Sequence, residues 1–309
     1  MPSLSLPTFP TDPSMLPADI ADRLSRIKHI ISDTDGTMLG GSSALTASDG
    51  TPSAELAATL VEAKRAGIDI IPCTGRNRAM TREDARILGL PGWIGEMGGI
   101  LCLHEGSQSD WHYYTADMPF DESCGKTPHE VICETGVIDR MLERWYDCLE
   151  TYHDNNIGYE YCEVTVALRG AVIEDEAQQM LDESGLPLYL ADNGFVNHIT
   201  GATILPAFES GQIEDVHTYH VTPRGLDKGT AARRYIELMG WDPTEVMCCG
   251  DSPADCAMAS AAGTFLLMRN GIANPKAQAA LATAGNAFVS ASNSTDGFCQ
   301  ALRTLIALR

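Results

Sequence analysis

The chain has 309 residues, with 42 acidic and 21 basic side chains and a formal net charge of -21. Nucleic acids and anionic membranes are bound mainly through clustered lysine and arginine, so the charge argues against both as partners. Apolar residues make up 44% of the sequence, which is enough for a buried core, and the length suggests two domains.

The amino-terminal segment, residues 1–16, is rich in proline and lacks the basic start and apolar run of a signal peptide, so we expect a flexible arm. No apolar stretch is long enough to predict a membrane span. The ten cysteines contain no C-x-x-C pair and are too sparse for a disulfide scaffold. These features predict a cytoplasmic protein with reduced thiols.

Strand and helix patterns alternate at both ends of the chain. Towards the amino end, the pattern predicts strands at residues 27–33 and 68–73 and helices at 53–66 and 78–88. Towards the carboxyl end, it predicts helices at 228–239, 254–262, 275–284 and 296–308, and strands at 246–249, 264–268 and 287–289. Continuous apolar strands between helices predict a doubly wound, mostly parallel α/β sheet with a Rossmann-like arrangement.

The middle of the chain, residues 105–220, follows a different pattern. Here we predict helices around residues 131–152 and 173–184, and strands around 159–168, 188–191, 195–199 and 202–205. We interpret the segment as an inserted α+β domain, which leaves residues 17–104 and 221–309 as the α/β core. The insertion holds 23 acidic and 4 basic residues, a net charge of -19, whereas the rest of the chain is almost neutral at -2.

Polar residues end the predicted core strands or open the helix that follows the insertion. They are the loops Asp33-Thr34-Asp35-Gly36-Thr37, Thr74-Gly75-Arg76 and Gly250-Asp251-Ser252-Pro253-Ala254-Asp255, and the helix start at Lys228. The carboxyl ends of parallel strands form the ligand-binding edge of such a sheet. Clustered carboxylates repel one another without a cation, oxygen ligands suit Mg²⁺, and hydroxyl and ammonium groups suit phosphoryl oxygens. Together they predict phosphoryl transfer.

These segments, in this order, resemble the four motifs of the haloacid dehalogenase superfamily. The insertion between the second and third motifs resembles the type-two cap of its Cof-like and sucrose-phosphatase-like branch. Gly95-Glu96-Met97-Gly98-Gly99 resembles that branch's ENG turn, with Met97 in place of asparagine. The resemblance implies a phosphatase that hydrolyses a small phosphomonoester, such as a sugar phosphate.

The resemblance also implies a role for each motif residue. Asp33 would be the nucleophile that forms an aspartyl-phosphate, and Asp35 would protonate the leaving oxygen and then activate water. An aspartate at position 35 favours a phosphatase over a dehalogenase. Thr74 and Lys228 would hold the phosphoryl oxygens.

A Mg²⁺ cofactor is implied as well. It would be bound by Asp33, the backbone carbonyl of Asp35 and Asp251, while Asp255 would orient Lys228 or a metal-bound water. One departure from the family's GD-x-x-ND pattern is that alanine occupies position 254, where asparagine is common.

Six further residues are candidate substrate contacts: Gly36, Thr37, Gly75, Arg76, Asn197 and His198. Glycine at position 36 would also permit a sharp turn. Arg76 could instead be a solvated surface residue, and Asn197 and His198 could be ordinary turn residues of the cap.

Two other functions remain open from the sequence. A phosphomutase could use the same aspartyl-phosphate, although related mutases usually carry their cap directly after the first motif. A regulatory module could bind phosphate or Mg²⁺ without turnover, as receiver domains do, but those domains are far shorter and have no such insertion.

Each motif taken singly could also have a purely structural role, because Asp33 and Asp35 suit a turn and Thr74 suits a helix cap.

Overall fold

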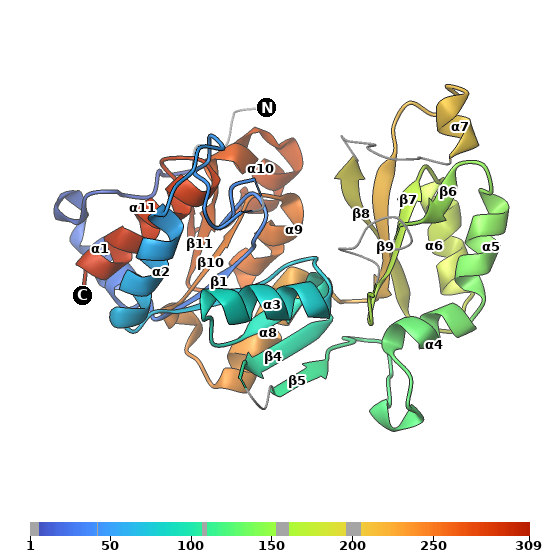
Figure 1. Ribbon diagram of the computed structural model, residues 1–309, viewed down its shortest axis with the longest axis horizontal. Helices are drawn as coiled ribbons and strands as arrows, with labels where there is room; N and C mark the ends of the chain where they lie inside the picture. Colours follow the sequence, from blue (N-terminus) through green and yellow to red (C-terminus); the bar gives the residue numbers. More distant parts are fainter. Residues whose placement is uncertain (1–5, 42, 107–109, 153–160, 196–204) are drawn as a thin grey trace. The chain divides into compact units, whose positions relative to one another are not determined.

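The computed structural model describes residues 6–41, 43–106, 110–152, 161–195 and 205–309 (Figure 1). Its contacts divide the chain into two compact units. The core unit comprises residues 1–74, 81–112 and 227–309, and the cap unit comprises residues 75–80 and 113–226. The cap unit therefore begins later and ends later than the predicted insertion at 105–220, and it also includes the short segment after Thr74.

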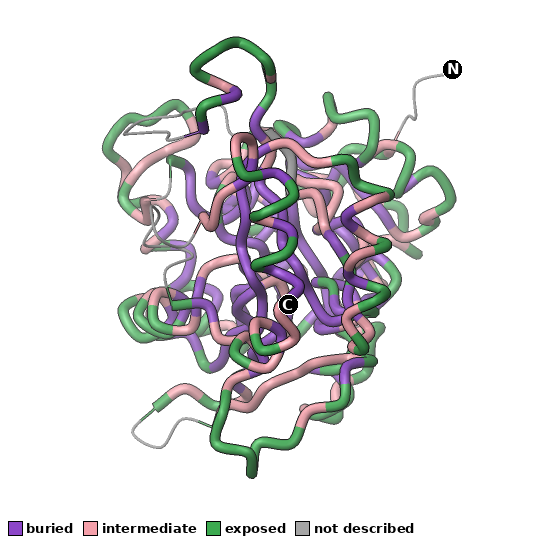
Figure 2. Tube along the Cα trace, turned by 90° about the vertical axis from the view of Figure 1, so that its right-hand side faces the viewer, coloured by how far each residue is buried: buried purple, intermediate pink, exposed green. Residues whose placement is uncertain are grey.

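A five-stranded parallel sheet forms the centre of the core unit, with strand order β12-β11-β10-β1-β2. The strands are β1 (His29–Ser32), β2 (Asp69–Pro72), β10 (Val246–Gly250), β11 (Thr264–Leu267) and β12 (Ala287–Val289). All residues of β10, β11 and β12 are buried, and Figure 2 shows the buried strands enclosed by more exposed segments. The mostly parallel α/β core is thus confirmed.

Seven helices belong wholly or largely to the core unit as the structure describes it. They are α1 (Ala18–Ser25), α2 (Glu55–Arg65), α3 (Arg78–Leu88), α8 (Lys228–Met239), α9 (Pro253–Cys256), α10 (Pro275–Leu281) and α11 (Ser294–Ala307). Figure 1 shows α2 beside α11 on one side of the strands, with α9 and α10 on the other. The predicted helix at 254–262 is shorter, because α9 gives way to a 3₁₀ turn at Ala257–Ser260.

Residues 7–10, part of the segment expected to form a flexible arm, instead pack against the core unit. The Phe9 amide donates to the Val289 carbonyl (2.6 Å), and the Phe9 ring meets Phe288 edge-on with ring centroids 5.5 Å apart. Phe9 is fully buried. Proline content indicated a loose segment, but one aromatic side chain and the free edge of β12 provide an anchor that composition does not reveal.

The cap unit is built on an antiparallel sheet with strand order β6-β7-β9-β8. Its strands are β6 (Leu149–Thr151), β7 (Val166–Gly170), β8 (Leu188–Phe195) and β9 (His217–Pro223), and its helices are α4 (Pro128–Glu134), α5 (Val137–Arg144), α6 (Glu174–Asp182) and α7 (Pro206–Glu209). Apolar residues of the sheet, including Leu168 and Val221, share one buried cluster with Ile138 of α5 and Leu181 of α6. The α+β character of the insertion is confirmed.

Two predictions for the cap were wrong in detail and one strand was missed, whereas the strands expected at 195–199 and 202–205 lie almost wholly outside the described residues. The helix expected at 131–152 is two helices, because Gly136 adopts a left-handed conformation (φ 69°), and its last part is strand β6. The strand expected at 159–168 is β7, which begins only at Val166. Strand β9 was not predicted, because it lies across the expected domain boundary at residue 220.

Strands β3 (Trp93–Gly95), β4 (Ile100–His104) and β5 (Asp110–Tyr113) form a further small sheet. In the described part of the chain, no helix is both long enough and apolar enough to span a membrane.

The turn between β3 and β4 adopts an unusual backbone conformation. Glu96, Met97 and Gly98 all have positive φ angles, of 49°, 57° and 111°. The Met97 amide donates to the Thr74 carbonyl (3.0 Å), and a Cβ on Gly98 would lie 2.5 Å from Cβ of Ala231 in α8. The turn therefore links the end of β2 to the start of α8.

Methionine is poorly suited to this turn, because a left-handed conformation costs an ordinary residue about 1–2 kcal/mol and asparagine tolerates it better. We predict that Met97→Asn raises the free energy of unfolding by about 0.5–1 kcal/mol, measured by urea denaturation. Met97→Leu, which keeps the steric cost, serves as control. Equal stabilities of the two variants would contradict the prediction.

Candidate active site

The loop after β1 carries the first two predicted site residues. The Asp33 amide donates to the Cys249 carbonyl of β10 (3.0 Å), which fixes this residue at the carboxyl end of the sheet. The Thr34 carbonyl then accepts from the amides of Thr37 (3.3 Å) and Leu39 (2.7 Å), so the chain turns back sharply. As a result the Asp33 side chain is buried, whereas Asp35 is exposed.

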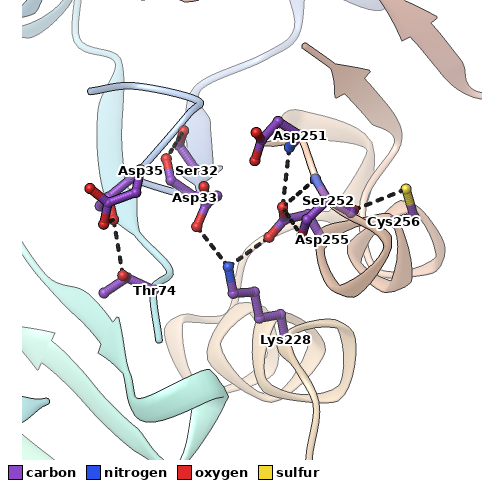
Figure 3. A network of polar contacts seen from close by, with 10 residues as sticks. Ser32, Asp33, Asp35, Thr74, Lys228, Asp251, Ser252, Asp255 and Cys256 are labelled. Carbon is purple, nitrogen blue, oxygen red and sulfur yellow. Dashed lines mark hydrogen bonds and ion pairs between the residues drawn. The ribbon is translucent and has the colours of Figure 1, made fainter. Parts of the chain in front are cut away.

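Lys228 joins two of the predicted carboxylates (Figure 3). Its ammonium group donates to Asp33 Oδ1 (2.7 Å) and to Asp255 Oδ1 (2.6 Å), and all three side chains are buried. Lys228 is the first residue of α8, whose start is fixed by a capping box between Asp227 and Thr230. Because a cation at a helix amino terminus faces the unfavourable end of the helix dipole, the two carboxylates are what hold it there.

Asp255 also organises the loop that follows β10. Its Oδ2 accepts from the amides of Asp251 (3.1 Å) and Ser252 (2.9 Å) and from the Ser252 hydroxyl (2.6 Å). Gly250 is needed beside it, because a Cβ at that position would lie 2.0 Å from the Asp255 Cβ. With both oxygens occupied, Asp255 is placed to orient Lys228 and the Asp251 loop.

Asp33, Asp251 and Asp255 each offer a carboxylate oxygen within 4.8 Å of the others, and Lys228 forms ion pairs with Asp33 and Asp255. Burial, reinforced by the charge of Asp255, raises the pKa of Asp33 to about 7 and that of Asp251 to about 6. Burial acts to lower the pKa of Lys228, but Asp255 and Asp33 outweigh it and raise that pKa. Three carboxylates and one ammonium leave excess negative charge, which a divalent cation would neutralise, so the donor set fits Mg²⁺.

The remaining predicted site residues lie outside the cluster of Lys228 and the three carboxylates. Thr74 is buried beside the same loop, where its Oγ1 accepts from the Thr34 hydroxyl (2.9 Å). Gly36 lies against Asp251, whereas the Thr37 side chain is fully buried. Gly75 and Arg76 group with the cap unit. The remaining two candidates, Asn197 and His198, lie outside the described residues.

Asn270 was not singled out from the sequence, although it contacts this site. Its Nδ2 donates to Asp251 Oδ2 (2.8 Å) and to the Gly36 carbonyl (3.0 Å). Asn270 follows the end of β11, at the same edge of the sheet as the other site residues. The rule that ligands bind at the carboxyl ends of parallel strands could therefore have identified it.

The chain is similar in sequence to known hydrolases. A sequence profile described as haloacid dehalogenase-like hydrolase matches residues 203–302. A phosphoglycolate phosphatase of Methanoculleus marisnigri is 26% identical over 245 residues, covering 79% of this chain and 85% of that protein. The Methanopyrus kandleri phosphoglycolate phosphatase is 27% identical over 251 residues, covering 80% and 86%.

Solved structures share the fold at low sequence identity. A Thermoplasma acidophilum protein is 15% identical with a TM-score of 0.61, over 92% of this chain and 99% of that one. The sucrose-phosphatase of Synechocystis, solved with sucrose and phosphate, is 16% identical with a TM-score of 0.56, over 90% and 97%.

The contact between Gly36 and Asp251 can be tested by substitution. Gly36 has a φ of 81°, and a Cβ there would lie 2.4 Å from Asp251 Oδ2. Gly41 also has a positive φ, of 57°, but a Cβ there would meet no atom within 4 Å. Both Gly→Ala variants carry the left-handed backbone cost of about 1–2 kcal/mol, and only Gly36→Ala adds the collision.

We predict that Gly36→Ala lowers the melting temperature by several degrees more than Gly41→Ala, measured by differential scanning calorimetry. Equal losses in the two variants would show that Asp251 does not pack tightly against the Asp33 loop.

Proposed function

We propose that this chain is a haloacid dehalogenase-like phosphatase with a type-two cap, and that it acts as a Mg²⁺-dependent phosphomonoesterase using Asp33 as nucleophile. The observation that carries the proposal is the buried contact of Lys228 with both Asp33 and Asp255, next to Asp251. Three motifs far apart in the sequence supply these groups, and the arrangement suits attack on a phosphoryl group.

In the first step, a carboxylate oxygen of Asp33 attacks phosphorus while the bond to the leaving oxygen breaks. Lys228 holds Oδ1 of Asp33, so Oδ2 would be the attacking atom. Asp35, two residues further on and exposed, would give its proton to the leaving oxygen as the alcohol departs. The product of this step is an aspartyl-phosphate.

In the second step, Asp35 would take a proton from water, whose oxygen attacks phosphorus and breaks the bond to Asp33. Inorganic phosphate leaves, and the carboxylate of Asp33 is restored. Lys228 and Thr74 are the proposed donors to the phosphoryl oxygens. Asp255 supports this role of Lys228 by fixing its ammonium group at 2.6 Å.

The proposed Mg²⁺ would be held by Asp33, Asp251 and the backbone carbonyl of Asp35. Bound there, the cation supplies positive charge that lowers the repulsion between Asp33 and an incoming phosphate. The geometry supports this assignment, because Asp33, Asp251 and Asp255 each offer a carboxylate oxygen within 4.8 Å of the others.

We propose a small organic monophosphate as substrate, a sugar phosphate being one such molecule. Because the matched relatives are phosphoglycolate phosphatases, phosphoglycolate is another compound to test, although its carboxylate makes it less suited to an acidic cap than an uncharged sugar phosphate body. Residues 105–220 carry a net charge of -19, which would disfavour a substrate with several phosphate groups. Although this acidity also suits a solvated surface, it favours a single phosphate on a neutral or cationic body.

We further propose that the protein works in the cytoplasm, where thiols stay reduced. All ten cysteines are free thiols, and most of them are buried.

The nucleophile is tested by Asp33→Asn. We predict that this variant loses about a thousand-fold or more in phosphate release from phosphoglycolate or a sugar phosphate with Mg²⁺. Its melting temperature should stay the same or rise, because asparagine removes one of three mutually repelling carboxylates. Asp19→Asn, an exposed position in α1, is the matched control. Turnover at the wild-type rate by Asp33→Asn would refute the mechanism, and an isomerised phosphate in place of free phosphate would indicate a mutase.

The charge of the cap is tested with a matched pair of substrates. We predict that fructose 6-phosphate has at least about a ten-fold higher kcat/KM than fructose 1,6-bisphosphate. Added salt should reduce this ratio of kcat/KM values, because it screens the repulsion between the acidic cap and the second phosphate. Steady-state phosphate release measures both. A bisphosphate that is hydrolysed as efficiently as the monophosphate would contradict selection by the acidic cap.

A further inference from the structure

Asn270 lies in the turn that follows β11 and uses its whole amide group. Its Nδ2 donates to Asp251 Oδ2 (2.8 Å) and to the Gly36 carbonyl (3.0 Å), while its Oδ1 accepts from the Ser294 amide (2.9 Å). Two of the partners are pure acceptors and the third is a pure donor. The amide can therefore have only this orientation, since the flipped one would set oxygen against oxygen.

The surrounding backbone leaves little freedom for these contacts. A Cβ on Gly36 would lie 2.4 Å from Asp251 Oδ2, and a Cβ on Gly271 would lie 2.1 Å from the Asp251 carbonyl. Ser294, the third partner, has a φ of 36°, a conformation that a residue with a side chain keeps only when its surroundings impose it. Three separate loops are thus held together around one asparagine.

We propose that Asn270 is a positioning residue that aims the Asp251 carboxylate at the metal and fixes it to the Asp33 loop. By binding Oδ2, it leaves Oδ1 of Asp251 directed to the cation. Through the Gly36 carbonyl, it also sets the distance between Asp251 and the loop that carries Asp33 and Asp35. The inference rests on the proposed Mg²⁺ site.

A neutral donor suits this task better than a charged one. A carboxylate oxygen of Asp251 lies within 4.8 Å of oxygens of Asp33 and Asp255, so the like charges repel one another and Asp251 needs a stabilising contact. A lysine or arginine would provide one, but its positive charge would compete with Mg²⁺ for the same oxygens. The Asn270 amide offers N–H groups without a full charge, as the outer partners of metal ligands commonly do.

The test compares Asn270→Ala with Asn274→Ala in the full-length protein. Asn274 lies in the same segment and also loses a backbone contact on substitution, because its Oδ1 accepts from the Lys276 amide (2.9 Å) and caps α10. It is not among the hydrogen-bond partners of Asp251. Titration calorimetry with MgCl₂ alone gives the dissociation constant of Mg²⁺, and scanning calorimetry gives the melting temperature.

We expect Asn270→Ala to weaken Mg²⁺ binding about ten-fold or more, as loss of a partner behind a metal ligand typically does. The kcat/KM should fall at low Mg²⁺ and recover at saturating Mg²⁺. Asn274→Ala should lower the melting temperature while its Mg²⁺ affinity stays within about two-fold of the wild type. Asn270→Ser, whose hydroxyl is too short to reach both acceptors, repeats the test should the alanine variant fold poorly.

Two results would overturn the inference, and they are distinguishable. If the wild type binds Mg²⁺ and both Asn270 variants bind it within about two-fold as tightly, Asn270 has no positioning role although the proposed function stands. If the wild type binds no Mg²⁺, the proposed metal site itself is wrong, and the role of Asn270 falls with it.

Discussion

The buried contact between one ammonium group and two carboxylates organises the candidate site. Lys228 lies between Asp33 and Asp255, at 2.7 and 2.6 Å, and all three groups are removed from solvent. Removing the ammonium group would typically cost about 3–5 kcal/mol, because the two buried carboxylates would be left uncompensated. The loop after β1, the loop after β10 and the start of α8 therefore depend on one another.

The parallel sheet brings these groups together. Strands β1 and β10 are neighbours in register, so the loops that follow them start at the same edge. Glycine is required where the loops approach most closely, at Gly36 beside Asp251 and at Gly250 beside Asp255. The site retains more negative charge than Lys228 neutralises, and this unbalanced charge makes it suitable for a divalent cation and a phosphoryl group.

The cap unit has different physical properties. It takes most of its residues from segment 105–220, which holds 23 of the 42 acidic residues of the chain, whereas the sequence outside that segment is almost neutral despite the four site aspartates. Its sheet is antiparallel, with an apolar cluster formed by helices α4, α5 and α6 on one face. A separate charge distribution and a separate apolar cluster allow the cap to vary its surface without disturbing the buried ion pairs of the core.

The sequence by itself determined the five strands of the parallel sheet and the helices between them, together with the loops that carry Asp33, Thr74, Lys228 and Asp251, because periodicity and strand ends are local properties. It did not reveal helix α1 or the short strands β3 and β4. It did not reveal the break at Gly136 or the docking of Phe9, since both depend on packing. Only the tertiary structure placed Asn270, whose partners Asp251 and Gly36 lie 19 and 234 positions away. Such a contact is decided by which loops meet at the sheet edge, which no local pattern of residues encodes.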